Sequence, residues 1–372
     1  MRPAIHRGFF VLPIQVADAA TVLARANTKL DHIQTISGEI GTITDTNLNG
    51  DFMATMTRAS NTQLYGIVRL LEDNISRVVL GKRDVARMCL TALLAGEHVL
   101  LEDVPGVGKT LMGKALSQSV AGKFCRVQFT PDLLPSDILG STIYNASSGE
   151  FSFNRGPIFC NFVLADEINR APPRTQSALL EAMSERQVSM DGHTHKLPEP
   201  FMVIATQNPF EYEGTYVLPE SQLDRFLLRI SVGYPERQFE EEILKTHRSG
   251  EPIEQLSAVA SPEDLAEIKR AVREVRVDDS ISRYMLDIVH ATRESKELSV
   301  GASTRGILLW YRAVQSFAFV ESRDYVVPDD VKKLAVPVLA HRVLTKSFAY
   351  ENQRNLTEAV IRRIMNEITS PG

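Results

Sequence analysis

Cysteine is scarce in this chain, and no long apolar run occurs in it. The three cysteines, Cys89, Cys125 and Cys160, form no C-x-x-C pair, so the sequence offers neither a disulfide framework nor a structural zinc site. A transmembrane helix needs about 18 apolar residues in a row, and even the run from Ile307 to Val320 is interrupted by an arginine and a glutamine. We therefore expect no membrane span, and a reducing compartment fits the cysteine usage best.

An excess of basic residues is also missing. Lys and Arg total 41 against 46 Asp and Glu, which gives a net charge of −5 and argues against a protein whose main role is to wrap duplex DNA. Hydrophobic residues make up 44% and charged residues 23%, proportions typical of globular domains and not of disordered chains. The length of 372 residues predicts about two folded domains.

Residues 1–62 are predicted to be an extension without a fold of its own. The segment from Thr42 to Gln63 is rich in Thr, Asn, Asp and Gly and has little apolar periodicity, a composition typical of a linker or a disordered segment. A short apolar stretch near the N-terminus has a faint likeness to a secretory signal, but Pro13 and Gln15 interrupt it. We therefore expect residues 1–62 to be disordered and the chain not to be exported.

From Leu64 onward, helical and strand patterns alternate. Apolar residues from Leu64 to Ile75 recur at helical spacing, a second helix begins near Asp84 and stops at Gly96, and the short apolar run 98–102 indicates a buried strand. Strands that alternate with helices predict a parallel sheet with helices on both faces. Further helices are expected at 109–120 and 175–184, and further strands at 125–129, 162–165 and 201–205.

Two segments of this region have hairpin patterns instead. Gly149 separates two short runs that contain Tyr144 and Phe151, and Asp191-Gly192 lies between short alternating runs within 188–197. After about residue 235 the strand pattern stops, and stripes at helical spacing such as Leu265, Ile268 and Val272 follow. The sequence therefore predicts two hairpin insertions in an α/β domain, followed by an all-helical domain.

A glycine-rich loop carries the most specific chemical signal. The run Gly106-Val107-Gly108-Lys109-Thr110 follows a predicted strand and opens a predicted helix. Its backbone N–H groups and the helix N-terminus can surround phosphate oxygens, Lys109 can reach the β- and γ-phosphates, and Thr110 can bind magnesium. The general pattern G-x-x-x-x-G-K-[ST] has glycine where this chain has Asp103, a departure that leaves the phosphate-binding residues in place.

Polar residues end the next two predicted strands. Asp166 and Glu167 follow an apolar strand, where Asp166 suits magnesium binding and Glu167 suits activation of an attacking water. The strand 201–205 ends in Thr206-Gln207-Asn208. A side-chain amide in this run could contact both the γ-phosphate and that water. These positions predict a nucleotide-hydrolysing site.

The chain resembles AAA+ ATPases, and more narrowly the MoxR family within the clade that carries a hairpin insert in the second helix. The resemblance runs from about Leu64 to the C-terminus, and Asp103 is ordinary for that family. It implies an α/β fold: a P-loop NTPase AAA+ core over residues 63–234, with a parallel sheet and helices on both faces, and a smaller all-helical lid domain over 235–372. The most specific stretches are LLEDVPGVGKT, LADEINRAPPRTQSALLEAMSERQVSMDG, IATQNPFEYEGTYVLPESQLDRFLL and GASTRG.

The same resemblance implies roles for single residues. Asn208 resembles sensor 1, Arg225 resembles the arginine finger presented to a neighbouring subunit, and Arg305 resembles sensor 2, although Thr304 stands where proline is expected. The implied Walker A pair is Lys109 and Thr110, the Walker B pair is Asp166 and Glu167, and Mg²⁺ is held by Thr110 and Asp166. The nucleotide-binding residues implied are Val79, Leu80 and Gly81 at the adenine and Pro105, Gly106, Val107, Gly108, Lys109, Thr110 and Leu111 at the phosphates.

As a function, the resemblance implies an ATPase that uses ATP and Mg²⁺, forms a homo-oligomeric ring, expected to be a hexamer, and remodels or assembles client protein complexes. The partner expected from it is a von Willebrand factor A-domain protein, and the location is cytoplasmic. A nucleic-acid translocase and a magnesium-chelatase-like motor subunit are the alternatives. The two hairpin turns, 145–150 and 191–196, contain only Lys196 as a basic residue, which argues against tracking of a phosphate backbone.

Overall fold

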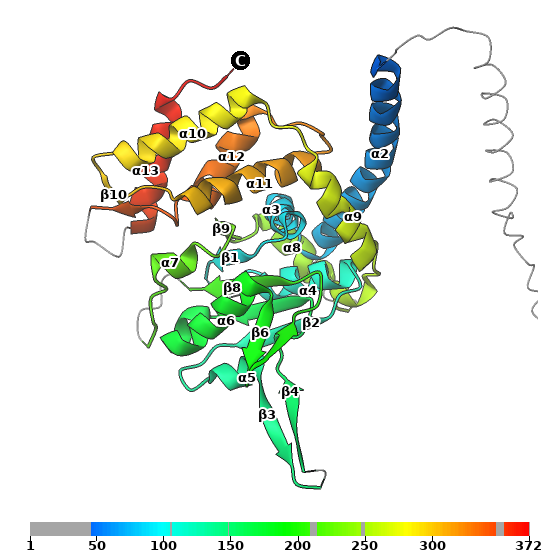
Figure 1. The fold of residues 1–372 in the computed structure, drawn as a ribbon, viewed down its shortest axis with the longest axis vertical. Helices are drawn as coiled ribbons and strands as arrows, with labels where there is room; N and C mark the ends of the chain where they lie inside the picture. The colour runs from blue at the N-terminus through cyan, green and yellow to red at the C-terminus, as the bar shows by residue number, and fades with distance from the viewer. Residues whose placement is uncertain are drawn as a thin grey trace, which may run out of the picture. The chain divides into compact units, whose positions relative to one another are not determined.

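Five parallel strands form the central sheet, in the order β2-β5-β8-β1-β9 (Figure 1). Strands β1 and β5 are buried over their whole length, as expected for apolar strands covered on both faces. This confirms the parallel sheet that the sequence predicts. The strands are β1 (Val99–Glu102), β2 (Phe124–Gln128), β5 (Phe162–Asp166), β8 (Met202–Gln207) and β9 (Leu228–Ile230).

In the strands β1, β5 and β8, alternate residues belong to two different cores. Leu101 and Leu164 pack in the core that includes the helices α3 and α4, whereas Leu100 and Val163 pack in a second core with the helix α6. This division follows from the period of two residues in a strand, which sends neighbouring side chains to opposite faces. The helices of this region are α3 (Arg83–Ala95), α4 (Lys109–Ser119), α5 (Pro135–Leu139), α6 (Pro173–Glu185) and α7 (Glu220–Leu223).

Both predicted hairpins are present. Strands β3 (Gly140–Asn145) and β4 (Glu150–Arg155) form one antiparallel pair, which projects away from the sheet in Figure 1. Strands β6 (Gln187–Met190) and β7 (His193–Lys196) form the other. The turn of the second hairpin has Asp191 at φ 51° and Gly192 at φ 79°, the two left-handed residues that a two-residue hairpin turn of this kind requires.

Helices dominate the chain after residue 235, as the sequence predicts. Two short strands that the sequence did not predict, β10 (Leu298–Val300) and β11 (Leu344–Thr345), pair antiparallel among them. Runs of two or three residues are too short to show an alternation of apolar and polar side chains, which is also why β9 was missed. The helices are α8 (Arg237–Thr246), α9 (Pro262–Arg273), α10 (Asp279–Glu294), α11 (Thr304–Val320), α12 (Pro328–Leu339) and α13 (Gln353–Glu367).

Helix α2 (Thr46–Val78) begins inside the segment expected to be an unstructured linker, so that expectation is wrong from Thr46 onward. Elongation of an existing helix is far cheaper than nucleation, and the stretch DFMATMTRAS contains several good helix formers. The contact pattern divides the chain between Arg58 and Ala59, and the predicted boundary near residue 234 stays a prediction.

This computed structural model describes residues 46–104, 106–147, 149–208, 214–246, 250–346 and 353–371, and only the backbone before Asn61. The predicted disorder of residues 1–45 lies outside these ranges. Among the residues that the structure describes, no helix combines the length and the apolar character needed to cross a bilayer.

Adjacent leucines of α2 provide a test of which face of this helix is packed. Leu71 is fully buried, whereas Leu70 has 51% of its surface exposed. We expect Leu71→Ala to lower the free energy of unfolding by about 2–5 kcal/mol, because it removes core contacts and leaves a cavity. Leu70→Ala is the matched control and should change it by less than about 0.5 kcal/mol. Denaturant unfolding measures both, and equal effects would contradict the packing described for α2.

Candidate functional site

The glycine-rich loop lies between the carboxyl end of β1 and the start of α4. Gly106 and Gly108 adopt φ angles of 86° and 90°, which non-glycine residues rarely adopt, although a Cβ at either position would meet no atom within 4 Å. Gly108 is the N-cap of α4 and provides no side-chain acceptor, so the first N–H groups of the helix stay available to an anion. Pro105 lies outside the described residues.

Asp103 fixes the start of this loop. Its carboxylate accepts hydrogen bonds from Ser231 Oγ at 2.8 Å and from the backbone N–H groups of Val104 and Gly233. Burial raises the pKa of Asp103, but these hydrogen bonds outweigh burial, so its pKa lies below the ordinary value. The aspartate that replaces the usual glycine therefore ties the loop to the end of β9.

Lys109 Nζ donates to the carbonyl oxygen of Asp103 at 2.8 Å. The pKa of Lys109 lies below its ordinary value, because burial lowers it. The neighbouring carboxylates, of which Asp166 has the largest effect, raise the pKa by less. The ammonium thus lies between the loop and the end of β5. Thr110 and Leu111 follow in the first turn of α4, where both are half-buried.

Asp166 ends β5 and is held by two neighbouring strands. Its Oδ1 accepts from Thr206 Oγ1 at 2.6 Å, and its Oδ2 accepts from Arg126 Nε at 3.0 Å and Nη2 at 2.6 Å. Thr206 Oγ1 in turn accepts from the backbone N–H of Glu167 at 2.8 Å. These contacts fix the backbone at the point where the chain leaves the sheet.

Glu167 has a left-handed backbone with φ 57°, a conformation that costs a non-glycine residue about 1–3 kcal/mol. Its carboxylate accepts from Gln128 Nε2 at 2.8 Å and lies 3.1 Å from Arg170 Nε. Sequence reasoning missed both β2 partners, Arg126 and Gln128. The available signal was their spacing of two residues, which places them on one face of a strand beside β5.

The strand register brings these groups to one edge of the sheet. Gln128 is paired with Asp166, Ala165 with Ala205, and Glu102 with Gln207. The phosphate loop, the two carboxylates and Asn208 therefore all follow the carboxyl ends of adjacent parallel strands. Ligands of open α/β sheets bind at this edge.

Arg225 lies at the opposite edge. It precedes β9, whose first residue, Leu228, is paired with Val99 at the amino end of β1. The length of β1, roughly 10 Å, separates it from the phosphate loop of its own chain. Its guanidinium donates to Leu180 O and, at 3.2 Å, to Ser184 Oγ, and no carboxylate of the described residues lies within ion-pair distance of it.

Arg305 lies beside this same segment. Its Nε is 3.8 Å from Asp224 Oδ2, and about half of its side chain is exposed. Arg225 and Arg305 therefore both lie beside the segment that precedes β9, near the amino edge of the sheet.

Arg342 is a buried arginine that sequence reasoning missed. Its Nε donates to Asp224 Oδ1 at 2.8 Å, and its other nitrogens donate to the carbonyl oxygens of Asp224, Phe226 and Leu227. Burial lowers the pKa of Arg342 to about 10. The contacts hold the backbone on both sides of Arg225. The signal was the charge of Arg342 inside an apolar run, because buried charges need such partners.

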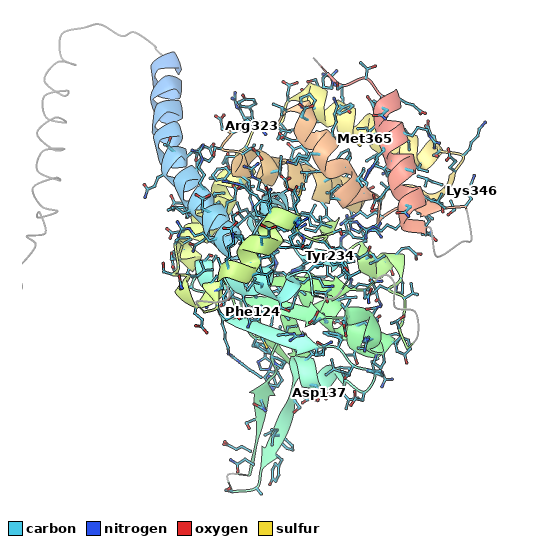
Figure 2. The ribbon with its side chains drawn as sticks, turned by 180° about the vertical axis from the view of Figure 1, so that it is seen from behind. Phe124, Asp137, Tyr234, Arg323, Lys346 and Met365 are labelled. Carbon is cyan, nitrogen blue, oxygen red and sulfur yellow. The ribbon has the colours of Figure 1, made fainter. Side chains whose placement is uncertain are left out.

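The segment expected at the adenine packs against the chain that follows β9. Gly81 has φ 71°, and a Cβ there would overlap the ring of Phe239. Lys82 Nζ donates to the carbonyl oxygen of Tyr234 at 2.7 Å, and Figure 2 shows Tyr234 between the sheet and the C-terminal helices. Val79 is buried in the core, so Leu80 is the more accessible of the two apolar residues.

The oxygen donors of the site fit magnesium. Thr110 supplies a hydroxyl and Asp166 a carboxylate, the hard ligands that Mg²⁺ prefers in combination with phosphate oxygens and water. Within the described ranges, no group of three His, Cys, Asp or Glu residues could hold a metal alone. A metal at this site would therefore depend on the nucleotide for most of its ligands.

Comparisons with known proteins agree with this geometry. The model of the ATPase family associated with various cellular activities (AAA) matches residues 98–228, and the AAA lid domain model matches residues 290–364. The chain is 50% identical over 309 residues to the uncharacterised protein YeaC of Bacillus subtilis, covering 83% of this chain and 96% of the relative. It is 42% identical over 306 residues to the chaperone MoxR1 of Mycobacterium tuberculosis, covering 80% of each.

A solved structure is also similar. The crystal structure of a protein from Cytophaga hutchinsonii, described as a candidate ATPase, superposes with a TM-score of 0.78 at 36% identity and covers 87% of this chain and 99% of its own. The sequence relatives and the AAA family models point to the same family as the phosphate loop and the carboxylates at the carboxyl edge of the sheet. The chain therefore belongs to the MoxR family of AAA+ ATPases.

Proposed function

We propose that this ATPase hydrolyses ATP with Mg²⁺ in a ring of identical subunits and uses the reaction to remodel or assemble client protein complexes. The observation that carries the proposal is the separation of two sets of residues to opposite edges of one sheet. The phosphate loop and the carboxylates lie at the carboxyl edge, and Arg225 and Arg305 lie near the amino edge.

At the carboxyl edge, the proposed roles follow from chemistry and position. The loop N–H groups and Lys109 bind the β- and γ-phosphates, and Thr110 and Asp166 hold Mg²⁺, which neutralises phosphate charge when bound. Glu167 accepts the proton of the attacking water, and Asn208 orients that water. The contacts of Glu167 to Gln128 and Arg170 keep its carboxylate at this edge of the sheet.

At the amino edge, Arg225 and Arg305 are proposed to serve the site of a neighbouring subunit. Negative charge spreads over the γ-phosphoryl oxygens during transfer, and one added guanidinium can be worth roughly 10³ to 10⁵ in rate. Arg225 has no carboxylate partner among the residues described here, so its charge is available to a phosphate. A ring, expected by resemblance to be a hexamer, would place the guanidinium of Arg225 beside the γ-phosphate bound by the neighbouring subunit.

A protein client is supported by the hairpin β3–β4. This hairpin exposes 49% of Ile143, 55% of Tyr144 and 74% of Phe151, and the rings of Tyr144 and Phe151 lie 5.0 Å apart. Exposed apolar groups suit an extended polypeptide segment, and the basic side chains that a nucleic-acid translocase needs are absent from the turn of this hairpin. By resemblance, a von Willebrand factor A-domain protein is the expected partner.

Two variants separate binding from hydrolysis. We expect Lys109→Ala to lose ATP binding, and Glu167→Gln to bind ATP while its turnover falls about 10²- to 10⁴-fold, because the lysine holds phosphates and the carboxylate acts on water. Glu181→Gln, an exposed glutamate of α6, is the matched control and should keep full activity. Binding of a fluorescent ATP analogue and phosphate release measure the two steps, and a similar loss of binding in Lys109→Ala and Glu167→Gln would contradict the assignment.

Mixed rings test the arginine supplied by the neighbour. Arg225→Ala should bind ATP and lose turnover, and mixing it with Lys109→Ala should restore part of the activity. The restored sites are those where an Arg225→Ala subunit supplies the phosphate loop and a Lys109→Ala subunit supplies the arginine. Arg283→Ala, an exposed arginine of α10, is the control and should keep full turnover. The absence of any recovery in rings shown to contain both variants would argue against the shared site.

The client surface can be tested without a known client. We expect Phe151→Ser to keep ATP turnover and to lose at least about half of the ability to suppress aggregation of heat-unfolded luciferase, because it removes an exposed apolar contact. Leu244→Ser removes a leucine of α8 that is 71% exposed and should leave both readouts unchanged. Equal suppression by both variants would exclude the hairpin as the contact surface.

A further inference from the structure

A cavity lies near the amino edge of the sheet, apart from the phosphate loop. Its volume is about 890 Å³, and its walls come from the end of α3, the loop 197–201 and the helices α9 and α11. None of its lining residues belongs to the loop 106–110 or to the pair Asp166 and Glu167. We propose that this cavity binds a small anionic ligand through Lys269 and Arg186, at a site separate from that of ATP.

The charge of the cavity is opposite in sign to that of the chain. Five of its lining residues are basic and two are acidic, a net charge of +3, whereas the whole chain carries −5. Positive charges gathered around a concave space raise the local concentration of anions. The charged residues are Arg186, Lys269, Arg270, Arg273 and Arg312, with Glu97 and Glu199.

Most of these cations have no anionic partner. Arg312 is paired with Glu97 at 3.3 Å, and Arg186 Nη2 donates to the neutral carbonyl oxygen of Gly96 at 2.6 Å. Within the described part of the chain, no carboxylate lies within ion-pair distance of Arg186, or of the three basic residues that α9 contributes. Arginines elsewhere, such as Arg323 and Arg342, have carboxylate partners.

Lys269 and Arg186 converge on Gly96. A Cβ at Gly96 would lie 3.3 Å from Arg186 Nη2 and 3.9 Å from Lys269 Nζ, so the missing side chain leaves both cations facing the same space. Lys269 Nζ donates no side-chain hydrogen bond to any described residue. Burial, followed by the charge of Arg186, lowers the pKa of Lys269 to about 8. A bound anion would relieve both effects, since it pairs with the two cations at once.

The remaining walls indicate the body of the ligand. Leu94, Pro198, Pro200, Leu265 and Tyr311 line the cavity, so an apolar or aromatic group can occupy the space next to the cations. The volume lies within the range of about 300–1,000 Å³ that is usual for small-molecule sites. The ligand class is therefore a small molecule with a phosphoryl or carboxylate group on a compact apolar body. Because sheet-side and helix-side residues both line the site, such a ligand would bridge them.

The test uses the full chain with Lys109→Ala, which weakens anion binding at the phosphate loop. Pyrophosphate and citrate are titrated while the melting temperature is followed, so that phosphoryl and carboxylate probes are compared. We expect at least one of the two probes to raise the melting temperature. In the same Lys109→Ala background, the additional substitution Lys269→Gln should weaken the apparent affinity for that probe roughly tenfold, which is the value of one charge-assisted hydrogen bond. Arg186→Gln should act similarly. Lys296→Gln, an exposed lysine outside the cavity, is the matched control.

Sulfate, which keeps its charge over this range, tests the pH dependence. Affinity should fall between pH 7 and pH 9, because the Lys269 ammonium, with a pKa of about 8, loses its proton and its attraction for the anion. The charged groups facing Lys269 are Arg186, Glu199, Glu97 and Arg273. Lys269→Arg should bind sulfate without this fall.

Three results would overturn the proposal. The first is that no probe stabilises the protein. The second is that Lys269→Gln and Lys296→Gln bind the anion probes with equal affinity. The third is that Lys269→Gln loses subunit assembly while its anion affinity is unchanged. The last result would assign the cavity to a contact between copies of the chain. Because all arms are performed without ATP turnover, failure here leaves the proposed ATPase mechanism untouched.

Discussion

All five strands of the central sheet run in the same direction, and this direction decides which residues of the site can meet. In a parallel sheet, every strand delivers the residue after it to the same edge, so β1, β5 and β8 bring the phosphate loop, Asp166 and Asn208 together. The same rule sends Arg225, which precedes β9, to the other edge. Within one subunit, Arg225 and the phosphate loop therefore lie at opposite edges of the sheet, which is the arrangement that the proposed shared site requires.

Polar side chains of neighbouring elements hold each edge in place. At the carboxyl edge, Arg126 and Gln128 of β2 bind the two carboxylates that follow β5, which compensates for the strained backbone of Glu167. At the amino edge, Arg342 and Asp224 fix the segment that contains Arg225. The ion pair of Arg342 and Asp224 is largely buried, so loss of either partner would leave an unpaired charge and cost more than loss of a surface ion pair.

The sequence predicted the features that depend on local chemistry. Gly106 and Gly108, Asp166 with Glu167, and the Asp191-Gly192 turn each need a particular residue at one position, so they can be recognised without the fold. Arg126, Gln128 and Arg342 were missed because their roles depend on which elements become neighbours in space. Strands of two or three residues are too short to show a period. Helix α2 began earlier than expected because elongation from a packed segment overrides a weak local composition.

A dilution series of the unmodified chain tests whether a neighbouring subunit completes the site. Phosphate release per subunit is measured over a range of concentrations, while sizing of the same samples reports the state of association. We expect activity per subunit to fall as the assemblies dissociate, because the role proposed for Arg225 requires a neighbouring subunit. Activity per subunit that stays constant down to concentrations where only monomers remain would show that the site needs no neighbouring subunit.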